Sequence, residues 1–238
     1  MIYVITGTDT DVGKTVATAA LAARELNSGH STAVYKPTQT GVADGEFGDA
    51  QNIVEWLGGP EKLSIAEGVR LREPMAPVDA ALAAGGMDAV RALPTLAQHL
   101  ARIRELAAAH DTVFVEGAGG LLVKLTAAGE TIADLAAALD AALVVVTRPD
   151  LGTLNHTALT LEAAASRGFT RGSLIVGSYP KNPTLLHRSN LGNLRELAEA
   201  QHWHFAGALP ARLASGNCAE RLVEAGLSLS AVNAAEHA

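Results

Sequence analysis

Short apolar runs alternate with longer amphipathic segments along the chain. The runs rich in β-branched and aliphatic residues are predicted to be strands, and they span 2–6, 32–36, 112–115, 141–147, 173–177 and 204–209. Most of them are continuously apolar, as expected for strands covered on both faces. Strands separated by helix-length segments favour an α/β fold with a mainly parallel, doubly wound sheet flanked by helices.

The segments between these strands carry helical spacing. In 93–110 the apolar residues recur at steps of three and four on one helix face: Leu93, Leu96, Leu100, Ile103 and Ala107. Other helices are predicted for 14–28 and from about Thr153 to Gly168, where glycine supplies a left-handed C-cap. Residues 67–86 are richer in glycine and proline, and we expect an irregular excursion over one sheet edge there.

The composition restricts the classes of partner. The 238 residues are 48% hydrophobic and 18% charged, which is ample for one α/β domain spanning residues 1–238. A formal net charge of −7 argues against a nucleic-acid or anionic-membrane binder, because both need a basic surface. A local anion site remains compatible with this charge. The single cysteine, Cys218, cannot form an internal disulfide.

The N-terminal residues and the lengths of the apolar runs bear on the cellular compartment. Residues 1–6 have no basic stretch and no small-residue cleavage site, so we interpret them as the first core strand rather than a signal peptide. No apolar run reaches the roughly 18 residues needed to span a bilayer. We therefore expect a soluble, cytoplasmic protein.

The strongest local motif is a P-loop-like segment at 7–15, which follows a predicted strand and precedes a predicted helix. Backbone N–H groups of such a loop, together with the helix N-terminus, bind phosphate oxygens. Lys14 is expected to meet the β- and γ-phosphates, and the Thr15 hydroxyl to meet Mg2+. The predicted nucleotide-binding residues of this segment are Asp11, Val12, Gly13, Lys14, Thr15 and Val16.

The spacing of this loop departs from the standard pattern. Five residues separate Gly7 from Gly13, so Thr8 stands where the first glycine is usually found. The alternative is a tight strand–helix turn that carries the Gly-Lys-Thr sequence by coincidence. We prefer nucleotide binding, because the motif lies where a first strand ends.

Three further polar residues follow predicted strands or begin a helix. Lys36 ends the second predicted strand and precedes the stiffening Pro37. Asp49 begins a predicted helix, and Glu116 is followed by a glycine-rich turn. With Thr15, phosphates and waters, Asp49 and Glu116 form a plausible Mg2+ shell. The alternatives are a solvated surface lysine, a simple helix N-cap, and a turn whose glycines only permit positive φ.

With these motifs the chain resembles the dethiobiotin synthetase family. The matching stretches occur in the family's order over roughly residues 1–210, and they are 7–15, 36–41, Asp49, 116–120 and 151–156. The lysine–proline turn and the Glu-Gly-Ala-Gly-Gly turn are together more specific than the P-loop alone.

The resemblance implies a Mg2+- and nucleotide-dependent ligase of biotin biosynthesis. One amine of 7,8-diaminopelargonic acid takes up CO2 as a carbamate, which attacks the γ-phosphate to give a carbamic–phosphoric anhydride. The second amine then closes the urea ring of dethiobiotin, releasing nucleoside diphosphate and phosphate. Lys36 and Lys14 match the family's catalytic positions. Preorganised positive charge there would stabilise the phosphoryl group that is transferred.

The resemblance also implies how the substrate is held. Thr10, Thr40 and Lys36 match substrate-binding positions. Family members are homodimers in which the partner subunit helps to bind the substrate's carboxylate tail, and the matching positions here are Leu154 and Asn155. A helix N-terminus suits an anion. The alternative for Asn155 is a first-turn residue that caps its own helix.

The nucleotide base is less constrained. The turn residues Gly117, Ala118 and Gly119 are predicted to face the nucleotide, but the Asn-Asp pair with which family members read adenine is replaced by Gly177-Ser178. Backbone groups near Gly177 and near 209–211 (Leu209, Pro210, Ala211) remain available to a base. ATP is therefore the default nucleotide, with CTP or another nucleoside triphosphate as an alternative.

Other classes of function stay open. A ParA/MinD-like dimeric switch ATPase shares the loop and the sheet, but such proteins carry a signature lysine where this chain has Asp9. A small-molecule kinase would transfer phosphate without bicarbonate. A non-enzymatic nucleotide-binding module would leave Lys36, Asp49 and Glu116 unexplained. No histidine or cysteine pair shows zinc-binding spacing, so His187, His202 and His204 are interpreted as ordinary residues.

Overall fold

The computed structural model describes residues 1–170, 172–215 and 218–232, in which strands and helices alternate. The strands are β1 (Ile2–Gly7), β2 (Thr32–Gln39), β3 (Leu63–Arg70), β4 (Thr112–Gly120), β5 (Ala142–Thr147), β6 (Ser173–Tyr179) and β7 (His204–Pro210). The helices are α1 (Lys14–Asn27), α2 (Asp49–Trp56), α3 (Pro77–Arg91), α4 (Leu96–Ala109), α5 (Ile132–Ala138), α6 (Thr153–Ala165), α7 (Leu185–Ala200) and α8 (Ala219–Ser228). None of the helices in the described ranges is long and apolar enough to cross a membrane.

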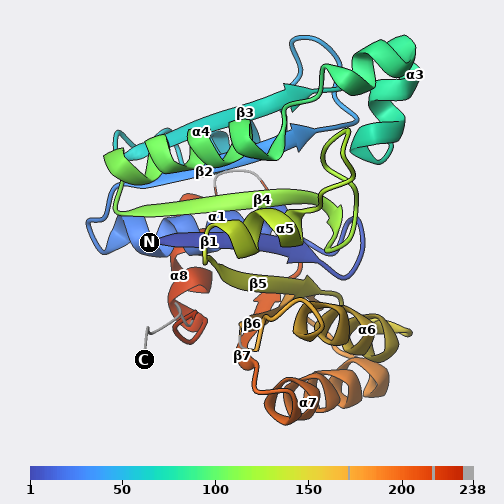
Figure 1. The fold of residues 1–238 in the computed structure, drawn as a ribbon. Coiled ribbons are helices and arrows are strands. Elements are labelled where there is room, and N and C mark those ends of the chain that lie inside the picture. The colour runs from blue at the N-terminus through green and yellow to red at the C-terminus, as the bar shows by residue number, and fades with distance from the viewer. Residues whose placement is uncertain (171, 216–217, 233–238) are drawn as a thin grey trace.

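The named strands form one sheet in the order β3-β2-β4-β1-β5-β6-β7, and each neighbouring pair is parallel (Figure 1). The prediction of a mainly parallel α/β sheet is confirmed. Because all strands point the same way, their carboxyl ends share one edge. Ligands of such sheets bind at that edge.

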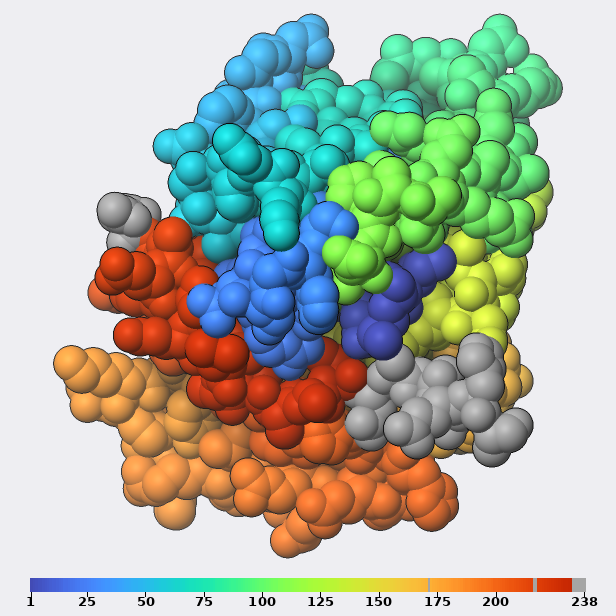
Figure 2. All heavy atoms as spheres, turned by 90° about the vertical axis from the view of Figure 1, so that its left-hand side faces the viewer, coloured from blue at the N-terminus to red at the C-terminus, as the bar shows by residue number. Residues whose placement is uncertain are grey.

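The pleat of the strands sorts their side chains between two cores. Tyr3, Ile5, Val34 and Phe114 lie in the core under α1, α2 and α8, whereas the alternate residues face α4 to α7. On the first face α8 packs directly on α1, and Figure 2 shows the two side by side at the amino ends of the strands. The sheet is therefore covered on both faces, as its apolar strands predict.

The expectation of an irregular segment at 67–86 is wrong in two places. Residues 63–70 form the edge strand β3, and Pro77 begins α3. β3 is only half-buried, so it lacks the continuous apolar run by which the other strands are recognised. Within α3, Gly85 and Gly86 leave the helical region of φ and ψ, which explains why no uninterrupted helical pattern is visible.

β2 continues past Lys36 through a proline. Pro37 has no N–H, and the β2–β3 pairing steps from Lys36–Glu67 to Thr38–Val69 across it. The partner position is Gly68, where a Cβ would overlap the Pro37 carbonyl oxygen. β2 therefore runs on to Gln39, and the predicted end of the strand at Lys36 with a turn after it is wrong.

Candidate active site

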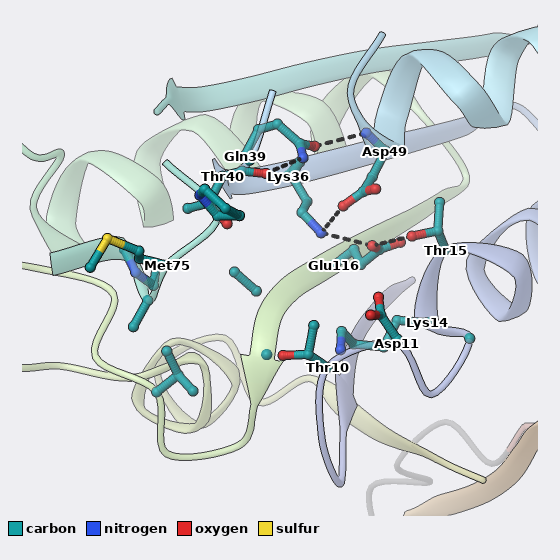
Figure 3. Close-up of a pocket in the computed structure, with 18 of the residues that line it drawn as sticks. Thr10, Asp11, Lys14, Thr15, Lys36, Gln39, Thr40, Asp49, Met75 and Glu116 are labelled. Atoms are coloured by element: carbon teal, nitrogen blue, oxygen red, sulfur yellow. Dashed lines mark hydrogen bonds and ion pairs between the residues drawn. The ribbon is translucent and has the colours of Figure 1, made fainter. Parts of the chain in front are cut away.

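A cavity of about 640 Å³ opens at the carboxyl ends of β1, β2 and β4 (Figure 3). Its walls include many residues that the sequence singles out: Thr10, Asp11, Gly13, Lys14, Thr15, Val16, Lys36, Thr40, Asp49, Glu116, Ala118 and Gly119. These residues come from the P-loop-like segment, the ends of two strands and the start of α2. The fold thus brings together groups more than 100 positions apart in sequence.

The P-loop-like segment has the backbone of an anion-binding turn. Asp11 and Gly13 have φ of 57° and 96°, and Gly13 is the N-cap of α1. The Lys14 ammonium lies back over the loop and donates to the Asp9 carbonyl oxygen at 2.9 Å. The N-terminus of α1 and this ammonium therefore face the same cavity.

The register of two neighbouring strands places Lys36 beside Glu116. Tyr35 pairs with Val115 in the β2–β4 ladder, so the next residue of each strand lies at the same level. Lys36 Nζ is 2.8 Å from Glu116 Oε1, and both side chains are almost completely buried. The alternative that Lys36 is a solvated surface lysine is therefore wrong.

Asp49 approaches the same ammonium from a helix. It is the first residue of α2, whose N-cap is Gly48, so the alternative of Asp49 as the N-cap is wrong. Its Oδ2 lies 2.5 Å from Lys36 Nζ, while about a third of its side chain is exposed to solvent. Lys36 thus lies between two carboxylates (Figure 3).

Hydroxyl groups of α1 complete the surroundings of Glu116. Thr15 Oγ1 donates to Glu116 Oε1 at 2.9 Å, and Thr18 Oγ1 donates to Oε2 at 2.8 Å. Because Lys36 also donates to Oε1, both carboxylate oxygens are satisfied although the residue is buried. The Glu116 side chain is consequently held in a single orientation toward the loop.

Burial and neighbouring charge act in opposite directions on the two lysines. Burial alone would lower the pKa of Lys36, but the Glu116 and Asp49 carboxylates outweigh it and raise that pKa above its ordinary value. Burial lowers the pKa of Lys14, with Glu116 opposing and Lys36 reinforcing the shift. Lys36 is therefore a firmly held cation.

The oxygen donors at the cavity suit a magnesium ion. Among the residues that the structure describes, no group of three or more His, Cys, Asp and Glu is arranged to hold a metal. The cavity instead presents the Asp49 and Glu116 carboxylates on the Lys36 ammonium, with the Thr15 hydroxyl bonded to Glu116. Few protein oxygens, supplemented by phosphate and water, are what Mg2+ uses at nucleotide sites, so the residues fit this ion.

Comparison with known proteins identifies the family. Residues 2–218 match the family model described as an AAA domain. Proteins described as ATP-dependent dethiobiotin synthetase BioD are 47% identical in Parafrankia sp. over 88% of this chain and 84% of theirs, and 48% identical in Mycobacterium avium over 87% and 88%. The chain belongs to the dethiobiotin synthetase family. A further such protein, from Rhodococcus jostii, is 45% identical over 91% of this chain and 90% of its own length.

Solved structures of the same architecture include the MinC:MinD cell division complex of Aquifex aeolicus. It matches 95% of this chain and 93% of its own with a TM-score of 0.58 and 11% identity. FtsY from Mycoplasma mycoides matches 95% of this chain and 67% of its own with a TM-score of 0.51 and 13% identity. At such identities the likeness shows the fold alone.

Some of the predicted nucleotide-binding residues lie outside the cavity wall. Val12 and Gly117 are buried behind it, and Gly177 packs against the loop, where a Cβ on Gly13 would lie 2.8 Å from its carbonyl oxygen. Ser178 follows Gly177 on β6. The end of β7 runs beside it, with Ala211 N–H donating to the Tyr179 carbonyl oxygen at 2.8 Å; Leu209 and Pro210 are at this end, and Leu209 is fully buried.

The first turn of α6 is also separate from the wall. Asn155 is exposed and Leu154 is half-buried. The N-cap of α6 is Gly152, and no side chain within the described residues caps this helix. The alternative that Asn155 caps its own helix is therefore unsupported by the geometry.

The structure adds wall residues that the sequence reasoning missed. They are Gln39, Gly41, Pro74, Met75, Ala76, Pro77 and Val123. Gln39 and Gly41 lie inside the stretch 36–41 and were recognisable by position. The segment 74–77 reaches the cavity because the Gly41 N–H donates to the Glu73 carbonyl oxygen at 3.1 Å, a contact that no local pattern reveals.

Proposed function

We propose that this chain is a dethiobiotin synthetase, a ligase that forms C–N bonds by closing a cyclic urea on 7,8-diaminopelargonic acid with CO2 at the expense of a nucleoside triphosphate. The observation that carries the proposal is Lys36, buried between Asp49 and Glu116 at the mouth of a P-loop. The family membership supports it. Residues 1–238 would act as one domain in the cytoplasm.

The nucleotide phosphates are proposed to bind where the loop meets α1. Backbone N–H groups from Asp11 to Val16 surround the anion, and Lys14 turns from the Asp9 carbonyl to the β- and γ-oxygens. Thr15, Asp49 and Glu116 would hold Mg2+, which neutralises charge on the phosphoryl group that is transferred. The turn Gly117–Ala118–Gly119 lets the backbone approach the phosphates closely.

Lys36 is the residue proposed to stabilise the carbamate. Its ammonium lies in a low-dielectric pocket, already oriented, so it attracts developing negative charge without reorganising in the transition state. Lys14, across the cavity from Lys36, would add a second positive charge (Figure 3). The carbamate oxygen would attack the γ-phosphorus and displace nucleoside diphosphate, and the second amine would then attack the carbamate carbon and expel phosphate as the ring closes.

The residues that line the cavity divide into polar and apolar ones. Lys36, Thr10 and Thr40 supply its polar groups, while Pro74, Met75, Pro77 and Val123 supply apolar surface. A diamine followed by an alkyl chain has the same division. We propose that the amines lie among these polar groups, with Thr10 and Thr40 as hydrogen-bonding partners.

A homodimer is proposed to complete the substrate site. Leu154 and Asn155, on an exposed helix start, would meet the carboxylate tail bound to a second copy. Three leucines near this helix are exposed, Leu151 by 80%, Leu185 by 77% and Leu186 by 38%. Apolar side chains of this size on a monomer surface favour burial against another chain.

The base of the nucleotide is proposed to be read by backbone groups near Gly177, Ser178 and residues 209–211. No asparagine side chain stands at this place to select adenine. ATP is the default, in keeping with the relatives' names. A preference of one or two hydrogen bonds, about 1–3 kcal/mol, would suffice to favour CTP or another triphosphate.

The test is phosphate release by the purified chain with diaminopelargonic acid, Mg2+ and bicarbonate, in parallel with ATP, CTP and GTP. Release that requires both the diamine and bicarbonate is the expected result, and the ranking of the three nucleotides identifies the base. Release that is indifferent to the diamine would overturn the proposal in favour of a MinD-like switch ATPase. Release with an alcohol acceptor and no bicarbonate dependence would favour a kinase.

A further inference from the structure

Gln39 is a buried amide at the end of β2, and its side chain is only 4% exposed. It lies three residues after Lys36 and lines the same cavity. Its Oε1 accepts the Asp49 N–H at 2.7 Å, and its Nε2 donates to the Thr40 carbonyl oxygen at 3.1 Å. A backbone N–H only donates and a carbonyl only accepts, so these two partners define the orientation of the amide.

The contact with Asp49 replaces a missing helix cap. The first N–H groups of a helix have no partner within the helix, and a side chain at the N-cap usually accepts from one of them. The N-cap of α2 is Gly48, which has no side chain. Gln39 supplies the acceptor from a different element, the strand that also carries Lys36.

Side-chain ends crowd the α-carbon of Gly48, next to this contact. A Cβ on Gly48 would lie 2.8 Å from Gln39 Oε1 and 2.8 Å from Glu67 Oε1. The φ of Gly48 is −86°, so the requirement for glycine is one of space, not of backbone conformation. A Cβ at position 48 would therefore push on the side-chain ends of Gln39 and Glu67, and the glycine leaves the Gln39 contact undisturbed.

Asp49 needs such support more than Glu116 does. Glu116 is buried and receives hydrogen bonds from two threonines of α1. Asp49 is about a third exposed and follows an open loop, residues 40–48, most of which is exposed. The Gln39 amide closes the two ends of this loop, because it joins residue 39 to residue 49 directly.

We infer that Gln39 is a positioning residue for the metal-binding carboxylate Asp49. It holds the start of α2 against the end of β2, so that the Asp49 carboxylate faces Glu116 and Thr15 across the cation position. The same amide holds the backbone of Thr40, the proposed substrate contact. The inference rests on the proposed role of Asp49 toward Mg2+.

The test measures metal binding directly, with Mn2+ as the probe. Free Mn2+ is followed by electron paramagnetic resonance in a titration of the full chain with ADP, corrected for ADP alone. Gln39→Met keeps the size of the side chain and removes both hydrogen bonds. We expect Mn2+ affinity to fall about tenfold, the usual effect of losing a group that orients a metal ligand. Gln39→Glu, which keeps an acceptor for the Asp49 N–H, is expected to bind Mn2+ more tightly than Gln39→Met.

The matched control removes the same kind of contact elsewhere. Gln98 Oε1 accepts the Thr95 N–H at 2.8 Å at the start of α4, away from the cavity wall. Gln98→Met is expected to leave Mn2+ affinity unchanged. Turnover is a second readout that separates metal positioning from a direct part in the reaction. Excess Mg2+ is expected to restore the rate of Gln39→Met, because only metal binding is weakened.

The outcomes are distinguishable. Mn2+ affinity of Gln39→Met equal to the unsubstituted chain, or an equal loss in Gln98→Met, would overturn the inference. Unchanged Mn2+ affinity in Asp49→Asn would show that Asp49 does not bind the metal, and the inference about Gln39 would then fail. If the unsubstituted chain binds Mn2+ and Gln39→Met weakens it, but phosphate release ignores the diamine, the positioning role stands and the proposed reaction fails.

Discussion

Lys36 Nζ lies 2.8 Å from Glu116 Oε1, with 4% of the lysine side chain and 1% of the glutamate side chain exposed. A buried ion pair contributes little to stability unless both charges are well satisfied. Here the pair also faces a P-loop, and Asp49 adds a second carboxylate to the same ammonium. The arrangement places fixed charge where a phosphoryl group would be transferred.

Replacing Lys36 by alanine is expected to lower turnover about a hundredfold or more, because a preorganised charge is lost from the transition state. Lys36→Arg keeps the charge but changes its reach, and an intermediate rate is expected. The measurement is kcat at saturating Mg2+ and nucleotide, with circular dichroism to verify the fold. A near-normal rate for Lys36→Ala would remove the residue from the mechanism.

Glu116→Gln is expected to reduce turnover about a hundredfold and to raise the Mg2+ concentration needed for activity. The amide has one acceptor oxygen, whereas Glu116 accepts from Thr15, Thr18 and Lys36. Thr18→Val, which removes a contact to Oε2 but no proposed metal ligand, is expected to have a smaller effect. The two variants are compared in Mg2+ titrations of phosphate release, and equal Mg2+ requirements in both would contradict the metal role.

Gly177→Ala is expected to weaken nucleotide binding, because the new Cβ would overlap the Val12 carbonyl oxygen and lie 3.1 Å from Gly13 Cα. The loop must move, and a loss of about 1.4 kcal/mol in binding free energy already corresponds to tenfold. Equilibrium titration with a fluorescent nucleotide gives the affinity. Unaltered affinity would show that the loop tolerates the displacement.

Two glycines serve as controls for this variant. Gly226→Ala would overlap the Ala20 carbonyl oxygen where α8 meets α1, so it is expected to lower stability without changing nucleotide affinity. Gly192 lies within α7 with nothing close to the new Cβ. Gly192→Ala is expected to stabilise the fold by roughly 0.5–1 kcal/mol, since alanine is the better helix former.

His99 is expected to make the protein sensitive to acid. It is fully buried, its Nδ1 contacts the Tyr35 hydroxyl at 2.7 Å, and burial lowers its pKa from 6.5 to about 4. Between these pH values the unfolded chain binds a proton that the folded protein does not, so stability falls as the pH falls from about 6.5 to about 4. This difference in the pKa of His99 corresponds to a loss of about 3 kcal/mol in the free energy of unfolding.

The measurement is the free energy of unfolding by urea at pH 7, 5.5 and 4.5. His99→Gln removes the titration, and its stability is expected to change less over this range than that of the unsubstituted chain. His202, on the surface, provides the matched comparison as His202→Gln, whose pH dependence should follow the unsubstituted chain. Parallel curves for all three proteins would show that His99 does not govern the acid sensitivity.

The elements near the site differ in how far local sequence predicts them. Apolar runs identify β1, β4 and β5 because these strands are buried on both faces, and the loop 7–15 is recognisable because its glycine and lysine follow such a strand. β3 and α3 could not be predicted in the same way. One is a half-buried edge strand, and the other is interrupted at Gly85 and Gly86.

Local sequence was enough to predict the parallel α/β architecture, and it singled out the P-loop-like segment and the charged residues that line the cavity, since each depends on the pattern of a short segment. The tertiary structure alone decided that Lys36 lies between Asp49 and Glu116, that Gln39 holds the start of α2, and that residues 74–77 close the cavity. These contacts join segments far apart in the chain. They follow from strand order and register, which local propensity does not encode.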